Sequence, residues 1–225
     1  ARPMGSSSGH ILKKGSPSGG PRQVEVVDEK GQGGGKAAGA FAHSLQRKFP
    51  LLPMVDEEQL GEAALRDNFI MRVFVYHRWQ QMLADGLSVE RLKAFHADHQ
   101  YLVLSHNPTA YKHLAEMLVD IDADSVKVVS CLYMEEMMSA LKHPASRVQH
   151  ATVLLQLLAH LEKQIDSGDK EEMLALIEQY REGEVPLLVP MTLLKHHFRR
   201  HPHDHIERQV YLTPHPHELM LRNLS

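Results

Sequence analysis

Histidine dominates the side chains of this sequence that are able to do chemistry. The chain has 225 residues, with 17 histidines and a single cysteine, Cys131. His96 and His99 lie one helical turn apart, and His106 and His113 follow at seven-residue steps. A zinc site needs three or four ligands that converge from separate elements, and no stretch has a metalloprotease spacing such as His-Glu-x-x-His. We therefore expect no metal site. A histidine-ligated metal enzyme is the weakest of three interpretations, behind nucleic-acid binding and protein binding.

The single cysteine excludes several kinds of site for this chain taken alone. Disulfides within the chain, thiolate zinc sites and cysteine-ligated iron–sulfur clusters all need more than one cysteine. No stretch approaches the roughly 18 uninterrupted apolar residues of a membrane-spanning helix, and the first residues lack the apolar core of a signal peptide. These features predict a cytoplasmic protein with no membrane partner.

The best partner-binding stretch by composition is residues 195–201, which have the sequence KHHFRRH. Cationic groups with interleaved rings suit phosphate neutralisation and base stacking, so the stretch favours nucleic-acid binding. A solvated helix end explains it equally well, because cations are favourably placed at the negative pole of the helix dipole. The sequence leaves both interpretations open.

Charge is distributed unevenly along the chain. Residues 1–56 have 8 Lys/Arg and 4 Asp/Glu, residues 57–140 have 7 and 13, and residues 141–225 have 10 and 11, which gives the formal net charge of −3. The protein is therefore not a globally basic nucleic-acid binder. The acidic middle segment supports a competing hypothesis, a protein-interaction or scaffold domain without nucleic-acid binding.

The pattern of apolar and capping residues predicts a mainly α fold with a small α/β part at the amino-terminal side. Residues 1–36 are rich in Gly, Ser and Pro around a short strand at 23–27, and 33–36 is expected to open a helix flexibly. Asp56 with Gln59, Ser88, and Asn107 with Pro108 are the expected helix starts. The expected helices are 36–48, 57–83 with a bend near Gly61, one after Ser88, 108–119, 123–141, 146–165, 169–181, 191–200 and 204–211.

Four stretches resemble the YbgA family, and the resemblance covers residues 88–225. They are 95–108 (FHADHQYLVLSHNP), 144–150, 180–196 (YREGEVPLLVPMTLLKH) and the ending from Gln209. The resemblance implies a multi-helix domain that binds tRNA. The residues that would form its RNA surface are Lys93, His96, His99, Tyr101, His106, Arg147, His150, Lys195, His196, Arg199, Arg200 and Arg208. Gln100 replaces the family's usual lysine, and Val148-Gln149 stand where arginines are common, so a reduced RNA affinity is expected.

Residues 10–83 resemble the carboxy-terminal part of the thiouracil desulfidase family, through the motif ILKKGSPS at 11–18. That resemblance implies a domain 1–83 joined to the domain 88–225. In the family, a four-iron cluster held by three cysteines removes sulfur from thiolated uracil, and the fused form is implied to act on 4-thiouridine in tRNA. The resemblance makes Ser16 the catalytic serine and Gly19 the occupant of a cluster-cysteine position. We expect no cofactor in this chain, no catalysis by it, and an amino-terminal desulfidase domain in cis as a partner.

Overall fold

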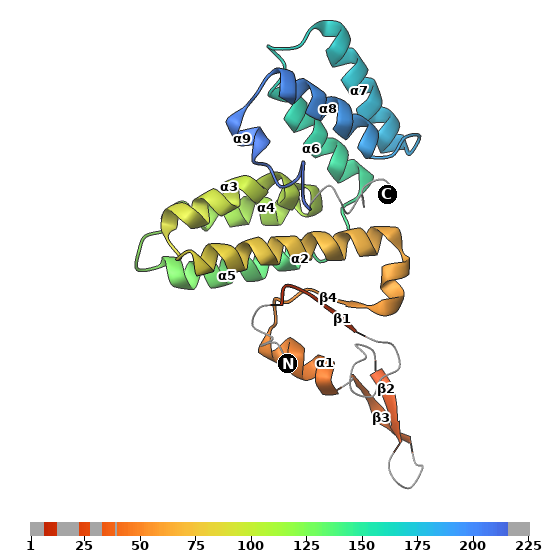
Figure 1. Ribbon diagram of the computed structural model, residues 1–225, viewed down its shortest axis with the longest axis vertical. Coiled ribbons are helices and arrows are strands. Elements are labelled where there is room, and N and C mark those ends of the chain that lie inside the picture. Colours follow the sequence, from red (N-terminus) through yellow and green to blue (C-terminus); the bar gives the residue numbers. More distant parts are fainter. Residues whose placement is uncertain (1–6, 13–22, 28–32, 39, 216–225) are drawn as a thin grey trace. The chain divides into compact units, whose positions relative to one another are not determined.

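A computed structural model describes residues 7–12, 23–27, 33–38 and 40–215. Helices make up most of this described part (Figure 1), which confirms the predicted mainly α fold. The chain divides into two compact units, Ala1–Arg78 and Trp79–Ser225, and helix α2 (Ala63–Ala84) runs across the division. The sequence placed the boundary between residues 83 and 88, immediately after this helix ends.

The first unit contains two small pairs of strands. Strand β1 (His10–Leu12) pairs in parallel with β4 (Met54–Asp56), and β2 (Gln23–Val27) pairs antiparallel with β3 (Gly33–Ala38). The strand predicted at 23–27 is therefore confirmed. The prediction that 33–36 opens a helix is wrong, because these residues belong to β3. Pairing with a neighbouring strand outweighs the low strand preference of glycine.

Helix α1 (Ala40–Lys48) begins four residues after the predicted start at residue 36. The capping box predicted from Asp56 and Gln59 is present, and it opens a short 3-10 helix, η2 (Glu57–Gly61). The helical path breaks after Gly61 and resumes at the start of α2. The bend expected near Gly61 is therefore a change from one helix to the next.

Glycine is required at one close approach in the first unit. A Cβ atom built on Gly9 would lie 2.4 Å from Cγ2 of Val73, a distance that side chains do not adopt. Gly9 therefore allows the segment before β1 to lie directly against α2, where Ser8 Oγ also lies 3.2 Å from His77 Nδ1.

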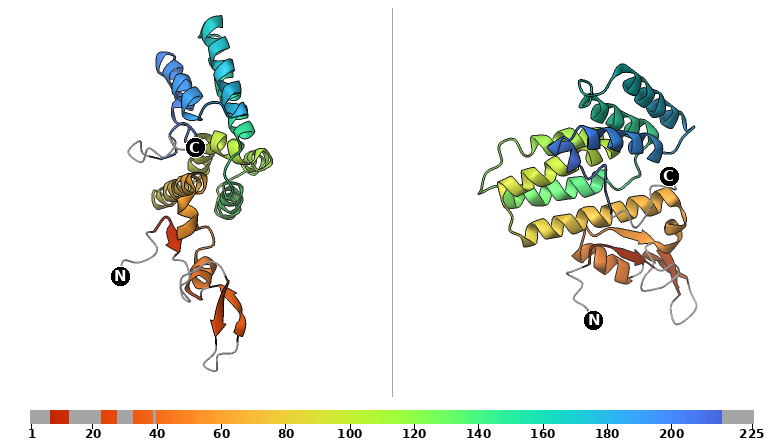
Figure 2. Two further views of the ribbon diagram at one scale, coloured as in Figure 1. Left: turned by 90° about the vertical axis from the view of Figure 1, so that its right-hand side faces the viewer. Right: turned by 45° about the horizontal axis from the view of Figure 1, so that its top comes forward.

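The second unit is built from helices. They are α3 (Val89–His106), α4 (Pro108–Glu116), α5 (Val126–Ala140), α6 (Arg147–Ala159), α7 (Ser167–Glu182), α8 (Leu188–Arg200) and the short α9 (Asp204–Glu207). Helix α3 contacts α4, α5 and α6, and α6 to α8 contact one another and stay side by side in both views of Figure 2. The core includes Tyr133, Tyr211 and Leu154, each with less than 2 % of its surface exposed.

The helix starts in this unit follow the predicted capping residues. The Ser88 side chain accepts a hydrogen bond from the Arg91 amide, and the Asn107 side chain accepts from the Thr109 and Ala110 amides directly before Pro108. Asp166 caps α7, which begins at Ser167, two residues before the predicted start at residue 169. The last helix is shorter than the predicted 204–211, because residues 208–212 leave the helix after Glu207.

Candidate nucleic-acid interface

The local sequence gives α8 two different faces. One face is buried and consists of Pro190, Met191, Leu194, His197 and Phe198. Pro190 lies in the first turn, where its missing amide hydrogen costs no helical hydrogen bond. The opposite face carries Thr192, His196, Arg199 and Arg200, all exposed. The spacing of three and four residues therefore directs the polar side chains of the predicted stretch 195–201 outward, except His197.

Helices α7 and α8 form a hairpin whose register is fixed at both ends. Helix α7 ends at Gly183, whose φ of 91° is the left-handed conformation that glycine adopts without strain. At the other end, Asp169 Oδ2 lies 3.9 Å from His197 Nδ1, and His197 is only 3 % exposed. The start of α7 therefore lies beside the end of α8, and the two helices run antiparallel.

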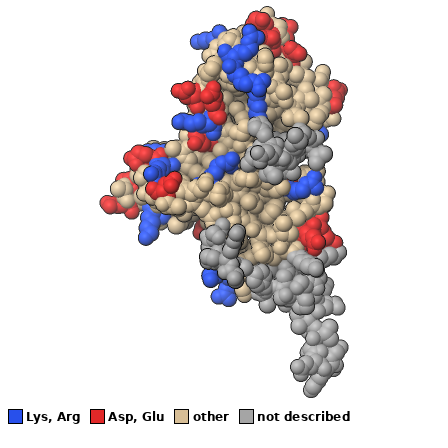
Figure 3. Space-filling view, in the orientation of Figure 1, with Lys and Arg blue, Asp and Glu red and all other residues tan. Residues whose placement is uncertain are grey.

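Basic side chains form a stripe along α8, in which Lys195 is half-buried and the others are exposed. We define the α8 stripe as Lys195, His196, Arg199 and Arg200; the Lys and Arg side chains over α8 are visible in Figure 3. The helix contains no Asp or Glu. Within the part of the chain that the structure describes, His196, Arg199 and Arg200 form no hydrogen bond or ion pair. The two guanidinium groups therefore have no carboxylate partner within the described residues.

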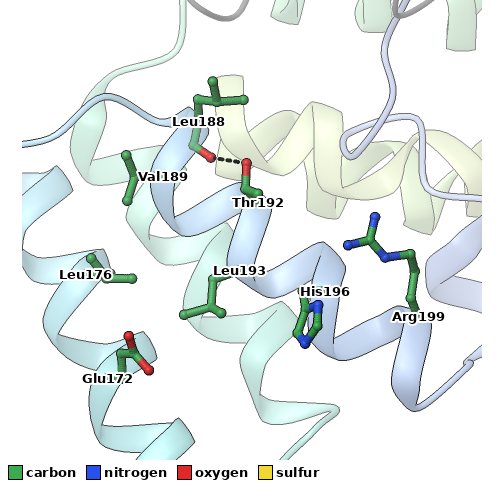
Figure 4. A pocket seen from close by; sticks show the side chains of 8 residues that line it. All are labelled: Glu172, Leu176, Leu188, Val189, Thr192, Leu193, His196 and Arg199. Carbon is green, nitrogen blue, oxygen red and sulfur yellow. Dashed lines mark hydrogen bonds between the residues drawn. The ribbon is translucent and has the colours of Figure 1, made fainter.

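A groove lies between α7 and α8 beside this stripe, and we call it the α7–α8 groove. Its volume is about 640 Å³. Figure 4 shows Glu172 and Leu176 on α7 facing Val189 and Leu193 on α8, with His196 and Arg199 farther along α8. Leu188 and Thr192 complete the lining, and the Thr192 hydroxyl donates to the Leu188 carbonyl at 2.7 Å. The groove is thus mainly apolar, with charged groups toward the end of α8.

Other predicted cations are engaged with the protein or stand apart from α8. Arg147 Nη1 donates to the carbonyl of Tyr180 at 3.1 Å, which uses the guanidinium to join two helices. Arg208 Nε lies 3.5 Å from Asp98 Oδ1. Lys93 is exposed on α3. The structure therefore brings together only the cations of the α8 stripe among those predicted from sequence.

Five predicted RNA-contacting residues have contacts inside the second unit. His96 Nδ1 lies 3.1 Å from the Tyr133 hydroxyl, and burial lowers the His96 pKa. The remaining contacts join His99 Nδ1 to the Phe95 carbonyl, Tyr101 Oη to His160 Nε2, His106 Nδ1 to the Leu102 carbonyl and His150 Nδ1 to Tyr211 Oη, at 2.7 to 2.9 Å. Because His99 and Tyr101 are 2 % and 7 % exposed, they offer no surface to a partner, and we leave both out of the proposed interface.

The rings of His160, His203 and His205 form a cluster at the end of α6, which no sequence pattern predicted. The His160 and His203 ring centroids are 5.2 Å apart, and those of His203 and His205 are 6.4 Å apart. Burial lowers the pKa values of His160 and His205, and the neighbouring His203 lowers both further. His203 and His205 are half-buried. The side chain of Gln100, where the family usually has lysine, hydrogen-bonds Nε2 of His205.

Three further predictions concern a metal, the membrane and catalysis. In residues 7–12, 23–27, 33–38 and 40–215, no group of three or more His, Cys, Asp or Glu side chains is arranged to hold a metal ion. Over the same residues, no helix combines the length and the apolar character that crossing a membrane requires. Ser16, the serine predicted to be catalytic, lies outside the described residues.

The fold and the site define a helical protein whose second unit presents a cationic helix beside an apolar groove. A family model described as "Protein of unknown function (DUF1722)" matches residues 100–216, so the chain belongs to this family. It is also 28 % identical over 158 residues to the "Uncharacterized protein YbgA" of Escherichia coli (strain K12), across 70 % of this chain and 94 % of that protein. No solved structure matches the chain.

These matches agree with the YbgA resemblance found in the sequence. The family model begins at residue 100. The resemblance of residues 10–83 to the desulfidase family therefore stays a prediction.

Proposed function

We propose that the second unit binds RNA through the α8 stripe, with tRNA as its partner. The observation that carries this proposal is the exposure of His196, Arg199 and Arg200 on a helix without acidic residues, where no carboxylate of the described chain pairs with them. Unpaired guanidinium groups on one helix face neutralise phosphates and release the counterions of the RNA. The YbgA resemblance independently implies the same partner.

The negative net charge of the chain is compatible with RNA binding, because several of its carboxylates interact with nearby side chains. Glu178 pairs with Arg181, Glu162 with Lys170 at 2.9 Å, and Glu136 with His113 at 2.6 Å. These pairs join α5 to α4, join the segment after α6 to the start of α7, and link two residues within α7. The formal net charge of −3 therefore includes carboxylates that already have a partner within the chain.

The RNA-binding unit would act together with a desulfidase domain in cis, as the resemblance of residues 10–83 implies. Such a domain removes sulfur from 4-thiouridine with a four-iron cluster. The residues of this chain do not fit that cluster, because its one cysteine, Cys131, is exposed on α5 in the second unit. We therefore propose that the chain itself delivers or holds tRNA and performs no sulfur transfer.

The test is a filter-binding titration of bulk tRNA with the whole chain. Arg199→Ala plus Arg200→Ala should weaken binding at least tenfold, since each residue removes a phosphate contact. A matched control is Lys127→Ala plus Lys142→Ala, which removes the same charge from exposed positions outside α8. Equal loss in both double variants would remove the α8 stripe from the site, and failure of the unmodified chain to bind tRNA would overturn the proposal.

A second candidate function is protein binding through α5. Val128 and Leu132 are 65 % and 53 % exposed, and they lie one helical turn apart with Cys131 between them. Exposed apolar side chains on one helix face are typical of a surface that contacts another protein. Absence of tRNA binding, together with concentration-dependent association that Leu132→Ser abolishes, would favour this function.

A further inference from the structure

The lining of the α7–α8 groove changes along its length in a defined order. Because Asp169 lies beside His197 in antiparallel helices, Glu172 on α7 is level with the middle of α8, near Leu193. One end of the groove is therefore apolar, formed by Leu176, Leu188 and Val189. His196 and Arg199 lie at the opposite end (Figure 4).

The size of the groove fits a single small group. Its volume of about 640 Å³ lies within the range of ordinary small-molecule sites. At a rise of about 1.5 Å per residue, the ten steps from Val189 to Arg199 span about 15 Å. This length accommodates a base, a sugar and a phosphate placed end to end.

We propose that the α7–α8 groove holds one unpaired ribonucleotide of the bound RNA. The base lies against Leu176, Val189 and Leu193, the ribose hydroxyl groups donate hydrogen bonds to Glu172, and His196 and Arg199 contact the phosphate. This inference rests on the proposed RNA-binding function and specifies which part of the RNA enters the site.

Charge complementarity favours RNA over a protein helix as the occupant. The positive charge of Arg199 continues beyond the groove to Arg200, which matches a chain that carries one negative charge per nucleotide. An amphipathic helix would need apolar anchors over several turns, whereas the apolar lining ends at Leu193 and is followed by His196 and Arg199.

Glu172 is the residue that makes the inference specific. A carboxylate near a phosphate chain is repulsive, and hydrogen bonds from neutral donors of the ligand can offset this repulsion. The ribose 2′-hydroxyl is such a donor, and its recognition distinguishes RNA from DNA. The groove should therefore favour a single-stranded RNA over a DNA oligomer with the same bases.

The first experiment measures the ratio of affinities for a short single-stranded RNA and the deoxy-oligomer of the same base sequence, with uracil retained. The unmodified chain should prefer the RNA, and Glu172→Ala should lower this preference about fivefold, the effect of one lost hydrogen bond. The control is Glu171→Ala, which removes the same charge from an exposed neighbour that does not line the groove. A general electrostatic effect would change both affinities equally in both variants, and that result would overturn the inference.

The second experiment tests the apolar end of the groove. Val189→Asp should weaken binding of single-stranded RNA about tenfold, because the new carboxylate replaces apolar surface under the base and repels the phosphate chain. Val119→Asp adds the same charge at another exposed valine, outside α7 and α8, and should have a small effect. Circular dichroism of both variants checks that they fold.

The outcomes separate this inference from the function on which it rests. If tRNA binding depends on Arg199 and Arg200 but is insensitive to Glu172→Ala and Val189→Asp, the RNA-binding function stands and the groove inference is overturned. If the groove variants instead disrupt association with a protein and leave RNA binding intact, a protein segment occupies the groove and the inference is again overturned. If the unmodified chain binds no RNA, both fail.

Discussion

The guanidinium of Arg147 lies over the ring of Tyr180, with 5.2 Å between its Cζ atom and the ring centroid, and donates to the Tyr180 carbonyl at 3.1 Å. Arg147 is the first residue of α6, and Tyr180 lies in the last turn of α7. One side chain therefore joins the start of one helix to the end of the next, beside the left-handed Gly183. This arrangement supports the hairpin that carries the α8 stripe.

Replacing Arg147 should affect stability more than RNA binding. Arg147→Ala removes a cation–π contact and a charge-assisted hydrogen bond, and should lower the free energy of unfolding by about 1 to 2 kcal/mol. Arg147→Lys keeps the charge but loses the planar geometry, so it should recover only part of this loss. Urea denaturation measures the first effect and tRNA filter binding the second. A large drop in RNA affinity for a variant of unchanged stability would indicate that Arg147 contacts the RNA.

The Asn107 cap predicts a similar test at the junction of α3 and α4. Its side chain accepts hydrogen bonds from the Thr109 and Ala110 amides, both at 3.0 Å. Asn107→Ala should lower the free energy of unfolding by about 1 kcal/mol, because both amides lose their partner. Asn107→Asp retains the acceptor and should be nearly neutral. Equal destabilisation by the two substitutions would show that the cap contributes little.

Local signals in the sequence were sufficient to place most helix starts. A capping side chain acts on amides two or three residues away, so Ser88, Asn107 and the Asp56–Gln59 pair identify helix starts without knowledge of the tertiary fold. The strand β3 was missed because its glycines and alanines have no strand signature of their own. Only pairing with β2 defines it.

The roles of individual histidines depend on contacts that the sequence does not reveal. His160 and Tyr101 are 59 residues apart in the chain, yet their Nε2 and Oη atoms lie 2.8 Å apart. Composition identified residues 195–201 as a basic stretch, but it did not show that His197 is buried beside Asp169 while Arg199 is exposed. Gln149, predicted to reduce RNA affinity, forms a capping box with Ser146 and donates to the His106 carbonyl at 2.9 Å.

The lowered pKa values of three histidines predict that acid destabilises the second unit. Burial lowers the pKa values of His96, His160 and His205 in the folded protein, so below about pH 6.5 the unfolded chain binds protons that the folded chain does not. The stability contributed by these neutral histidines is present above that pH and is lost as the pH falls. The urea midpoint should therefore decrease between about pH 7.5 and about pH 5.5.

Two variants test the origin of this pH dependence. His160→Gln plus His205→Gln removes two of the titrating groups and should flatten the decrease. His113 acts in the opposite direction, because its hydrogen bond to Glu136 raises its pKa and adds stability below the pKa of the unfolded state. His113→Gln should therefore steepen the decrease. A midpoint that rises on acidification would contradict the assignment of these histidines as neutral in the folded unit.

The α8 stripe makes a quantitative prediction for the salt dependence of RNA binding. Each phosphate contact with a single strand contributes about 0.7 to the slope of log K against log salt concentration. Arg199→Ala plus Arg200→Ala should therefore reduce the slope by about 1.4, whereas Lys127→Ala plus Lys142→Ala should leave it nearly unchanged. Filter binding of tRNA at several salt concentrations gives both slopes. A weaker affinity with an unchanged slope would mean that Arg199 and Arg200 act by holding α8 in place, because phosphate contacts cannot be lost without a change in counterion release.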